Sequence, residues 1–185
     1  DGHGHFTDVS LTQFGDTFRN IDWTFTPNFA DTNNDRWPDL LLAADFNTSR
    51  TFRNRQDGTF EETTNEAVLA DENGMSAAVG DVDNDGDLDW FVSSIYDVDG
   101  VAEGNWGLTG NRLYKNRGDG TFDDATEDSG VRIGYWGWGS CLQDFNNDGH
   151  LDIFHVNGFP VLPASQFHAD PARFSSEVAA LRGRT

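Results

Sequence analysis

Cysteine is almost missing from this sequence: Cys141 is the single cysteine among 185 residues. One thiol cannot form a disulfide within the chain. Taken alone, this usage suits a protein of a reducing compartment such as the cytosol.

Positive charge and long apolar runs are scarce as well. The chain has 12 Lys and Arg residues against 32 Asp and Glu residues, and its formal net charge is −20. Nucleic-acid binding needs clustered basic side chains, so nucleic acid is excluded as a partner. The sequence contains no run of about 20 apolar residues, so we expect no membrane insertion. It also contains no G-x-S-x-G motif around Ser140 and no acid–base pair that stands out, so we assign no catalytic residue.

The abundant feature is a short acidic pattern that occurs three times. It reads Asp-x-(Asp/Asn)-x-Asp-x-x-x-Asp and is followed by apolar residues. We name these segments loop 1 (residues 31–39), loop 2 (81–89) and loop 3 (144–152). Positions 1, 3, 5, 7 and 9 are Asp31, Asn33, Asp35, Trp37 and Asp39 in loop 1, Asp81, Asp83, Asp85, Asp87 and Asp89 in loop 2, and Asp144, Asn146, Asp148, His150 and Asp152 in loop 3.

This spacing predicts a metal site in each loop. Side chains at positions 1, 3 and 5 can point at one centre, position 7 can offer its main-chain carbonyl, and the aspartate at position 9 can close the site. Hard oxygen ligands without Cys or converging His favour a hard cation, and a flexible cage of oxygens suits Ca²⁺ better than Mg²⁺. A divalent ion also offsets the repulsion among the carboxylates. We therefore expect about three Ca²⁺ ions, one in each loop.

An EF-hand would share the first half of this pattern. Its loop requires a bidentate Glu at position 12 and a helix on either side. Position 12 is Leu42, Val92 and His155 here, and the residues that follow each loop read as short strands. The sequence therefore favours a structural site over a calcium sensor. We expect a lower affinity in loop 1, because Arg36 places a cation and a Cβ at position 6, where Gly86 and Gly149 stand in the other loops.

A second motif recurs between the loops and indicates a repeat. "NRQDGTFEETT" begins at Asn54 and "NRGDGTFDDAT" begins at Asn116, and Phe6, Phe60 and Phe122 recur at intervals of 54 and 62 residues. Each unit reads as four short strands, with the acidic loop between the first two and an Asp-Gly turn between the last two. In the second unit we expect strands near 75–80, 88–95, 112–116 and 121–125. Four antiparallel strands in each repeat predict an all-β fold of propeller blades.

The residues also resemble a known family. "GDVDNDGDLDWFV", "NRLYKNRGDGTF" and "QDFNNDGHLDIFHVNG" are similar to FG-GAP/VCBS repeats, and "WGWGS" with "HVNG" resembles the ASPIC/UnbV and cartilage-acidic-protein branch. This resemblance implies a seven-bladed β-propeller with Ca²⁺ in the blade loops, usually extracellular. The repeat segment would cover residues 1–160, with units near 20–66, 72–127 and from 133 onward. Residues 161–185 would be an incomplete repeat or a C-terminal extension, with a possible short helix from Ser175.

Three units are too few for a closed propeller, which has at least four blades. The chain begins inside a turn motif, without Met or a signal peptide, and "PARFSSE" resembles the start of a third strand that is not continued. We therefore expect a piece of a longer protein. The missing blades would come from the same parent chain or from another copy.

The function that follows from these features is a calcium-binding scaffold for binding or adhesion, with a protein or glycan ligand that the sequence does not name. Loops of this kind bind calcium with dissociation constants of about 10⁻⁴ to 10⁻³ M in extracellular modules. This need for a high calcium concentration outweighs the argument from the single cysteine, so we expect a secreted or periplasmic location.

The alternative is a polysaccharide-acting enzyme or a lectin-like domain on the propeller face. A pocket for it would use Trp106 and the acids of the insertion, Asp97, Asp99 and Glu103. Tyr135 and Trp136 are further candidates for a glycan surface. Trp138, in contrast, aligns with Met75 and Phe25 and is expected in the packing of the blades.

Overall fold

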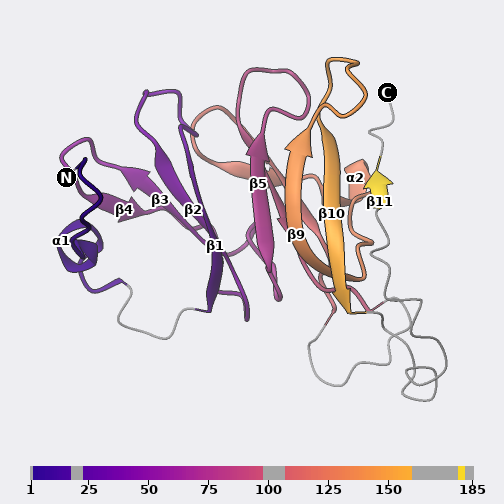
Figure 1. Cartoon of the computed structure of the whole chain (residues 1–185), viewed down its shortest axis with the longest axis horizontal. Helices are drawn as coiled ribbons and strands as arrows, with labels where there is room; N and C mark the ends of the chain where they lie inside the picture. Colours follow the sequence, from indigo (N-terminus) through magenta and orange to yellow (C-terminus); the bar gives the residue numbers. More distant parts are fainter. Residues whose placement is uncertain (1, 18–22, 98–106, 160–178, 182–185) are drawn as a thin grey trace.

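The chain folds into three antiparallel β-sheets that follow one another along the molecule. This computed structural model describes residues 2–17, 23–97, 107–159 and 179–181. Figure 1 shows the sheets in sequence order, from the indigo and purple strands through the magenta to the orange ones, and the first strands β1, β5 and β9 lie side by side. No helix among these residues is long and apolar enough to cross a membrane.

Sheets 1 and 2 are four-stranded meanders, in which each strand pairs with its neighbour in sequence. Sheet 3 has the order β11-β10-β9 among the described residues. The strands are β1 (Thr24–Ala30), β2 (Asp39–Ala44), β3 (Arg50–Asn54) and β4 (Phe60–Glu62) in sheet 1, β5 (Ser76–Gly80), β6 (Asp89–Ser93), β7 (Arg112–Asn116) and β8 (Phe122–Asp124) in sheet 2, and β9 (Trp136–Gln143), β10 (Asp152–Phe159) and β11 (Ala179–Leu181) in sheet 3.

The acidic loops connect the first and second strand of each sheet in the same register. Asp39 pairs with Ala30, Asp89 pairs with Gly80, and Asp152 pairs with Gln143. The aspartate at position 9 is thus the first residue of a second strand in all three sheets. This confirms the placement of the loops and the four-strand pattern of the second unit that the sequence predicts.

The second strands of sheets 1 and 2, β2 and β6, are buried on both faces because the sheets stack against one another. In sheet 1, Leu41 and Ala43 face sheet 2, where they join a cluster with Trp90, Val92 and Tyr114. Phe91 lies on the opposite face of β6 and packs with Leu113, Val131 and Ile153 toward sheet 3. Such strands need apolar residues at consecutive positions, which explains the runs "LLLAA" and "WFV".

Two short helices were not expected from the sequence. Helix α1 (Ser10–Phe14) places Phe14 on the outer face of sheet 1, where its ring stacks on Phe60 with 4.7 Å between the centroids. Helix α2 (Thr126–Ser129) follows β8 and ends at Gly130, whose φ of 66° is left-handed. Segments of four or five residues are too short to show an amphipathic period.

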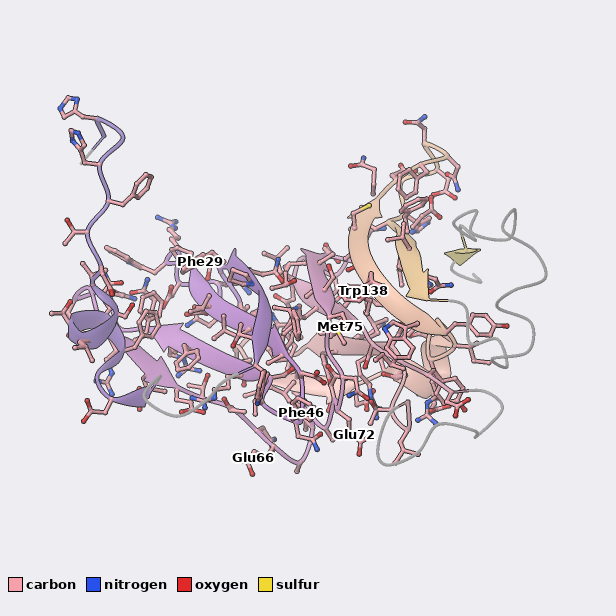
Figure 2. The ribbon with its side chains drawn as sticks, turned by 60° about the horizontal axis from the view of Figure 1, so that its bottom comes forward. Phe29, Phe46, Glu66, Glu72, Met75 and Trp138 are labelled. Carbon is pink, nitrogen blue, oxygen red and sulfur yellow. The ribbon has the colours of Figure 1, made fainter. Side chains whose placement is uncertain are left out.

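Two further expectations differ from the structure. The short helix that the sequence allowed from Ser175 lies mostly outside the described residues, and the three described residues of that range, Ala179–Leu181, form strand β11, which pairs with β10. Met75 is buried, whereas Trp138 and Phe25 are 39% and 49% exposed, so full burial in the blade core applies to Met75 and not to Trp138 or Phe25. Figure 2 labels Met75 at the start of sheet 2 and Trp138 on β9. Trp138 lies over Gly158, where a Cβ would meet its ring.

Candidate metal centres

The three acidic loops share one backbone conformation. Position 4 is Asn34, Asn84 or Asn147, with φ of 60°, 60° and 58°, and asparagine tolerates this left-handed region. Position 6 is left-handed too, with φ of 96° at Gly86, 87° at Gly149 and 74° at Arg36. Loop 1 therefore keeps the turn of the other loops, although its position 6 carries a Cβ and is strained by it.

Carboxylates organise each loop through the backbone. The side chain at position 1 accepts the N–H groups of positions 5 and 6, at N···O distances of 3.0 and 2.7 Å for Asp31, 3.0 and 2.9 Å for Asp81, and 3.1 and 2.9 Å for Asp144. The side chain at position 5 accepts the N–H of position 7 in every loop, at 2.9 to 3.0 Å. The loops are therefore curled around their oxygen-bearing side chains.

These hydrogen bonds keep two of the carboxylates charged. The N–H of Trp37 lowers the pKa of Asp35, and the N–H of Gly149 lowers the pKa of Asp144, because both bonds favour the ionised form. An ionised oxygen is the form that a hard cation binds.

The aspartate at position 9 is buried in loops 1 and 2 and partly buried in loop 3. Asp39 and Asp89 are 3% and 1% exposed. One oxygen accepts the N–H of loop position 2, at 3.3 Å for Asp39, 3.0 Å for Asp89 and 3.1 Å for Asp152. The other oxygen of Asp39 and Asp89 accepts the N–H of an asparagine that ends the third strand, Asn54 or Asn116, at 2.8 and 2.9 Å.

Loop 2 gathers its acids most closely. One oxygen each from Asp81, Asp83 and Asp89 lies within 4.8 Å of the other two. Burial raises the pKa of Asp89, and the nearby Asp83 and Asp85 raise it further. The Nζ atom of Lys115 lies 2.7 Å from Oδ2 of Asp83, and this bond raises the pKa of Lys115. A hard oxygen donor set that already attracts an ammonium group fits a cation.

The residues at position 7 and the ligands of loop 3 differ from the others in their contacts and exposure. The side chain of Asp87 accepts a hydrogen bond from Asn34 of the neighbouring loop, at 2.7 Å. Trp37 and His150 are exposed and stand at position 7, so their role would rest on the main-chain carbonyl. Loop 3 is the most solvent-exposed of the three, with Asn146 and Asp148 both exposed.

Sequence reasoning missed three kinds of residue around the loops. Asn34 and Asn84 extend to the next loop, Asn54 and Asn116 hold the position-9 carboxylate, and Lys115 contacts Asp83. The signal was present, since asparagine stands at position 4 of all three loops and heads both copies of the turn motif. Their contacts are to other sheets or other strands, so spacing alone did not show what they bind.

The residues of the alternative enzyme pocket fall largely outside the described residues. Trp106, Asp99 and Glu103 all lie in 98–106, and only Asp97 of that set is described. Tyr135 is 46% exposed, and Trp136 is partly buried at the start of β9.

Comparison with known proteins agrees with the loop pattern. The family model of the FG-GAP-like repeat matches residues 31–92 and 97–155, a range that includes all three loops. Cartilage acidic protein 1 of Homo sapiens is 50% identical over 48 residues, and cartilage acidic protein 1 of Xenopus tropicalis is 48% identical over 48 residues. Each match covers 25% of this chain and 7% of the relative's length.

Proposed function

The chain belongs to the FG-GAP-like repeat family, and from this membership we propose that it is a calcium-stabilised segment of a β-propeller that serves as a binding or adhesion scaffold. Sheets 1, 2 and 3 would be three successive blades of a propeller of about seven. The repeat units would run over residues 20–66, 72–127 and from 133 onward, and residues 161–185 would continue or extend the last unit.

The observation that carries the proposal is the acid cluster of loop 2. Asp89 is 1% exposed and lies with Asp81 and Asp83 in a group whose oxygens are within 4.8 Å of one another. Three carboxyl groups at this spacing repel one another unless a positive charge is present. Lys115 supplies one such charge at the exposed edge, and a divalent cation supplies a larger one.

Calcium is the ion that the donor set favours. Carboxylate, amide and main-chain oxygens are hard ligands, and a flexible loop suits the larger coordination number of Ca²⁺. The ion would supply positive charge and would hold the loop to the first residue of the second strand. The residues that would hold it are positions 1, 3, 5, 7 and 9 of loop 2 (Asp81, Asp83, Asp85, Asp87, Asp89), and the same positions of loop 1 and loop 3.

Exposed aromatic side chains of sheet 1 and loop 1 support the idea that further blades pack on this segment. Phe25 and Phe29 of β1 are 49% and 62% exposed, and Trp37 of loop 1 is 45% exposed. Figure 2 labels Phe29 on this sheet. The missing blades would come from the same parent protein or from a second copy. The binding partner of the scaffold, a protein or a glycan, is not identified by these residues.

A secreted or periplasmic location follows from the affinity expected of such loops. Extracellular calcium modules bind with dissociation constants of about 10⁻⁴ to 10⁻³ M, which calcium outside the cell can satisfy. The identity with segments of cartilage acidic protein 1 supports the same location.

The test compares the chain with and without calcium. After treatment with EGTA, metal analysis and a melting curve in added CaCl₂ should show bound calcium and a melting temperature several degrees higher. Asp81→Asn combined with Asp83→Asn should remove one equivalent of calcium. Asp57→Asn, in the exposed hairpin between β3 and β4, is the matched control and should remove none. A chain that binds no calcium and melts identically in both buffers would contradict the proposal.

A further inference from the structure

The acidic loops of neighbouring sheets are joined by a repeated hydrogen bond. Nδ2 of Asn34, at position 4 of loop 1, donates to Oδ1 of Asp87, at position 7 of loop 2, over 2.7 Å. Nδ2 of Asn84, at position 4 of loop 2, lies 3.0 Å from Nδ1 of His150, at position 7 of loop 3, and donates to the carbonyl of Gly149 over 3.1 Å. The same two loop positions therefore meet across both sheet boundaries.

The residue at position 7 makes this contact relevant to the metal sites. Its main-chain carbonyl is a proposed ligand, and its N–H is held by the position-5 carboxylate, at 2.9 Å for Asp87 and 3.0 Å for His150. A hydrogen bond that fixes the position-7 side chain also restricts the backbone that would present this carbonyl. Asn34 thus acts on loop 2, and Asn84 acts on loop 3.

Asn116 makes a second, buried connection between loops 1 and 2. Asn116 is only 6% exposed. Its Nδ2 donates to the carbonyl of Thr32 in loop 1 over 2.8 Å and to the carbonyl of Leu88 in loop 2 over 3.1 Å. Its backbone N–H donates to Oδ1 of Asp89 over 2.9 Å. One residue therefore contacts both loops and a proposed ligand.

We propose that the metal sites of adjacent loops are coupled, so that calcium in one loop raises the calcium affinity of the next. This inference rests on the proposed function. Each loop holds several carboxylates, and their repulsion opposes the tight curl when no cation is bound. Binding in loop 1 would fix Asn34 and the Thr32 carbonyl, and these groups would then be in place to hold loop 2. The second ion would meet a loop whose ordering cost is already reduced.

Long-range electrostatics acts in the opposite direction. An ion in loop 1 reduces the negative potential at loop 2 and so lowers its affinity. The Debye length is about 8 Å at 0.15 M ionic strength, so titrations in that salt weaken this term relative to the direct hydrogen bonds. A positive coupling measured in such a buffer would therefore indicate that the hydrogen bonds between the loops cause it.

The experiment follows each loop separately in a calcium titration of the ¹⁵N-labelled chain by NMR. The amide N–H groups of Gly86 and Gly149 donate to the position-1 carboxylates of loops 2 and 3 and report on those loops. Asp31→Asn combined with Asp35→Asn removes two carboxylate ligands of loop 1. We expect this change to weaken calcium binding at Gly86 by about threefold to tenfold, the effect of losing one or two hydrogen bonds.

The matched variants keep every proposed ligand. Asn34→Gly and Asn84→Gly preserve the left-handed backbone but remove the amide, and each should weaken the following loop, at Gly86 and Gly149 respectively. Asn147→Gly makes the same change in loop 3, where the side chain makes no hydrogen bond among the described residues, and should change neither affinity. In the Asn34→Gly background, removal of the loop 1 ligands should weaken loop 2 by a smaller factor than in the wild type.

The outcomes separate the two proposals. If no loop shows a saturable shift with calcium, the proposed function fails and the coupling fails with it. If all loops bind but the affinity at Gly86 is unchanged or increased by loss of loop 1, the coupling alone is overturned. Near-UV circular dichroism of the aromatic side chains, among them the buried Trp90, shows whether each variant is folded. Asn84→Gly gives an independent answer should a loop 1 variant unfold.

Discussion

The ammonium group of Lys115 lies 2.7 Å from Oδ2 of Asp83, so a protein cation already contacts the acid cluster of loop 2. Both side chains are only partly exposed, at 38% and 37%. Arg53, the residue of sheet 1 that corresponds to Lys115, donates instead to the carbonyl of Asp119 in sheet 2. Loop 2 thus has an internal competitor for any metal that uses Asp83.

Replacing Lys115 with Gln should therefore raise the calcium affinity of loop 2. The ion would no longer displace a salt bridge, and we expect a gain of about threefold to tenfold at moderate salt. The amide resonance of Gly86 in a calcium titration measures it. Arg55→Gln is the control, since Arg55 pairs with Glu61 on the outer strands of sheet 1. Equal or weaker binding in the Lys115 variant would show that the lysine does not compete.

Two glycines of "WGWGS" should differ sharply in their tolerance of a methyl group. A Cβ on Gly137 would lie 2.8 Å from the backbone oxygen of Ser94 and 3.1 Å from Oδ1 of Asn111, whereas a Cβ on Gly139 would meet only Val156, at 3.6 Å. Gly137→Ala should destabilise the fold by about 2 kcal/mol or more, because a backbone atom must move. Gly139→Ala should stay within about 0.5 kcal/mol of the wild type. Urea unfolding of both variants compares them directly, and similar losses would argue against the close approach of β9 to the end of β6.

The sequence predicted the parts of this fold that depend on local pattern. The apolar runs that start at Leu40 and Trp90 identified the second strands, and the Asp-Gly turns at Asp57 and Asp119 identified the hairpins. It could not predict contacts made between sheets. The exposure of Trp138 depends on what packs on the far side of β9, and the partner of Asn34 lies 53 residues away in the chain.

Asp71 should make stability fall as the pH rises. It is 0% exposed in the segment that joins sheets 1 and 2, and burial raises its pKa to about 7, against the opposing effects of Ser94, Asn73 and Arg112. The usual value is 3.8, so between these values the folded state retains a proton that the unfolded state has released. The free energy of unfolding must then decrease with increasing pH across this window.

Asp71→Asn removes this titration, so the stability of the variant relative to the wild type should increase as the pH rises from 4 to 8. The expected gain at pH 8 is a few kcal/mol, since a buried charge is replaced by a neutral amide. Urea unfolding at several pH values, with EGTA present throughout, measures it. Asp57→Asn is the control. Hydrogen bonds from Thr59 lower the pKa of Asp57, so this carboxyl makes the stability change with pH only at pH values below 4. A difference between Asp71→Asn and the wild type that does not change with pH would contradict this role.

His155 should make stability fall as the pH falls, which is opposite to the effect of Asp71. It stands on β10 at the position that Leu42 and Val92 occupy in the other sheets, it is 0% exposed, and neither ring nitrogen has a hydrogen-bond partner among the described residues. Burial lowers its pKa below the usual 6.5, so the unfolded state takes up a proton that the folded state does not. Stability contributed by the neutral ring is present above pH 6.5 and is lost as the pH falls.

His155→Leu should therefore stabilise the chain, and by more at pH 5 than at pH 8. The gain at pH 8 should be about 1 kcal/mol, from relief of two unpaired polar atoms in an apolar interface. Because the slopes of Asp71 and His155 oppose each other between pH 5 and 6.5, the slope of the wild type there should lie between those of the two single variants. Melting curves of the wild type, both variants and the double variant test this directly. A wild type whose slope in that range does not lie between those of Asp71→Asn and His155→Leu would show that the two buried groups do not offset each other.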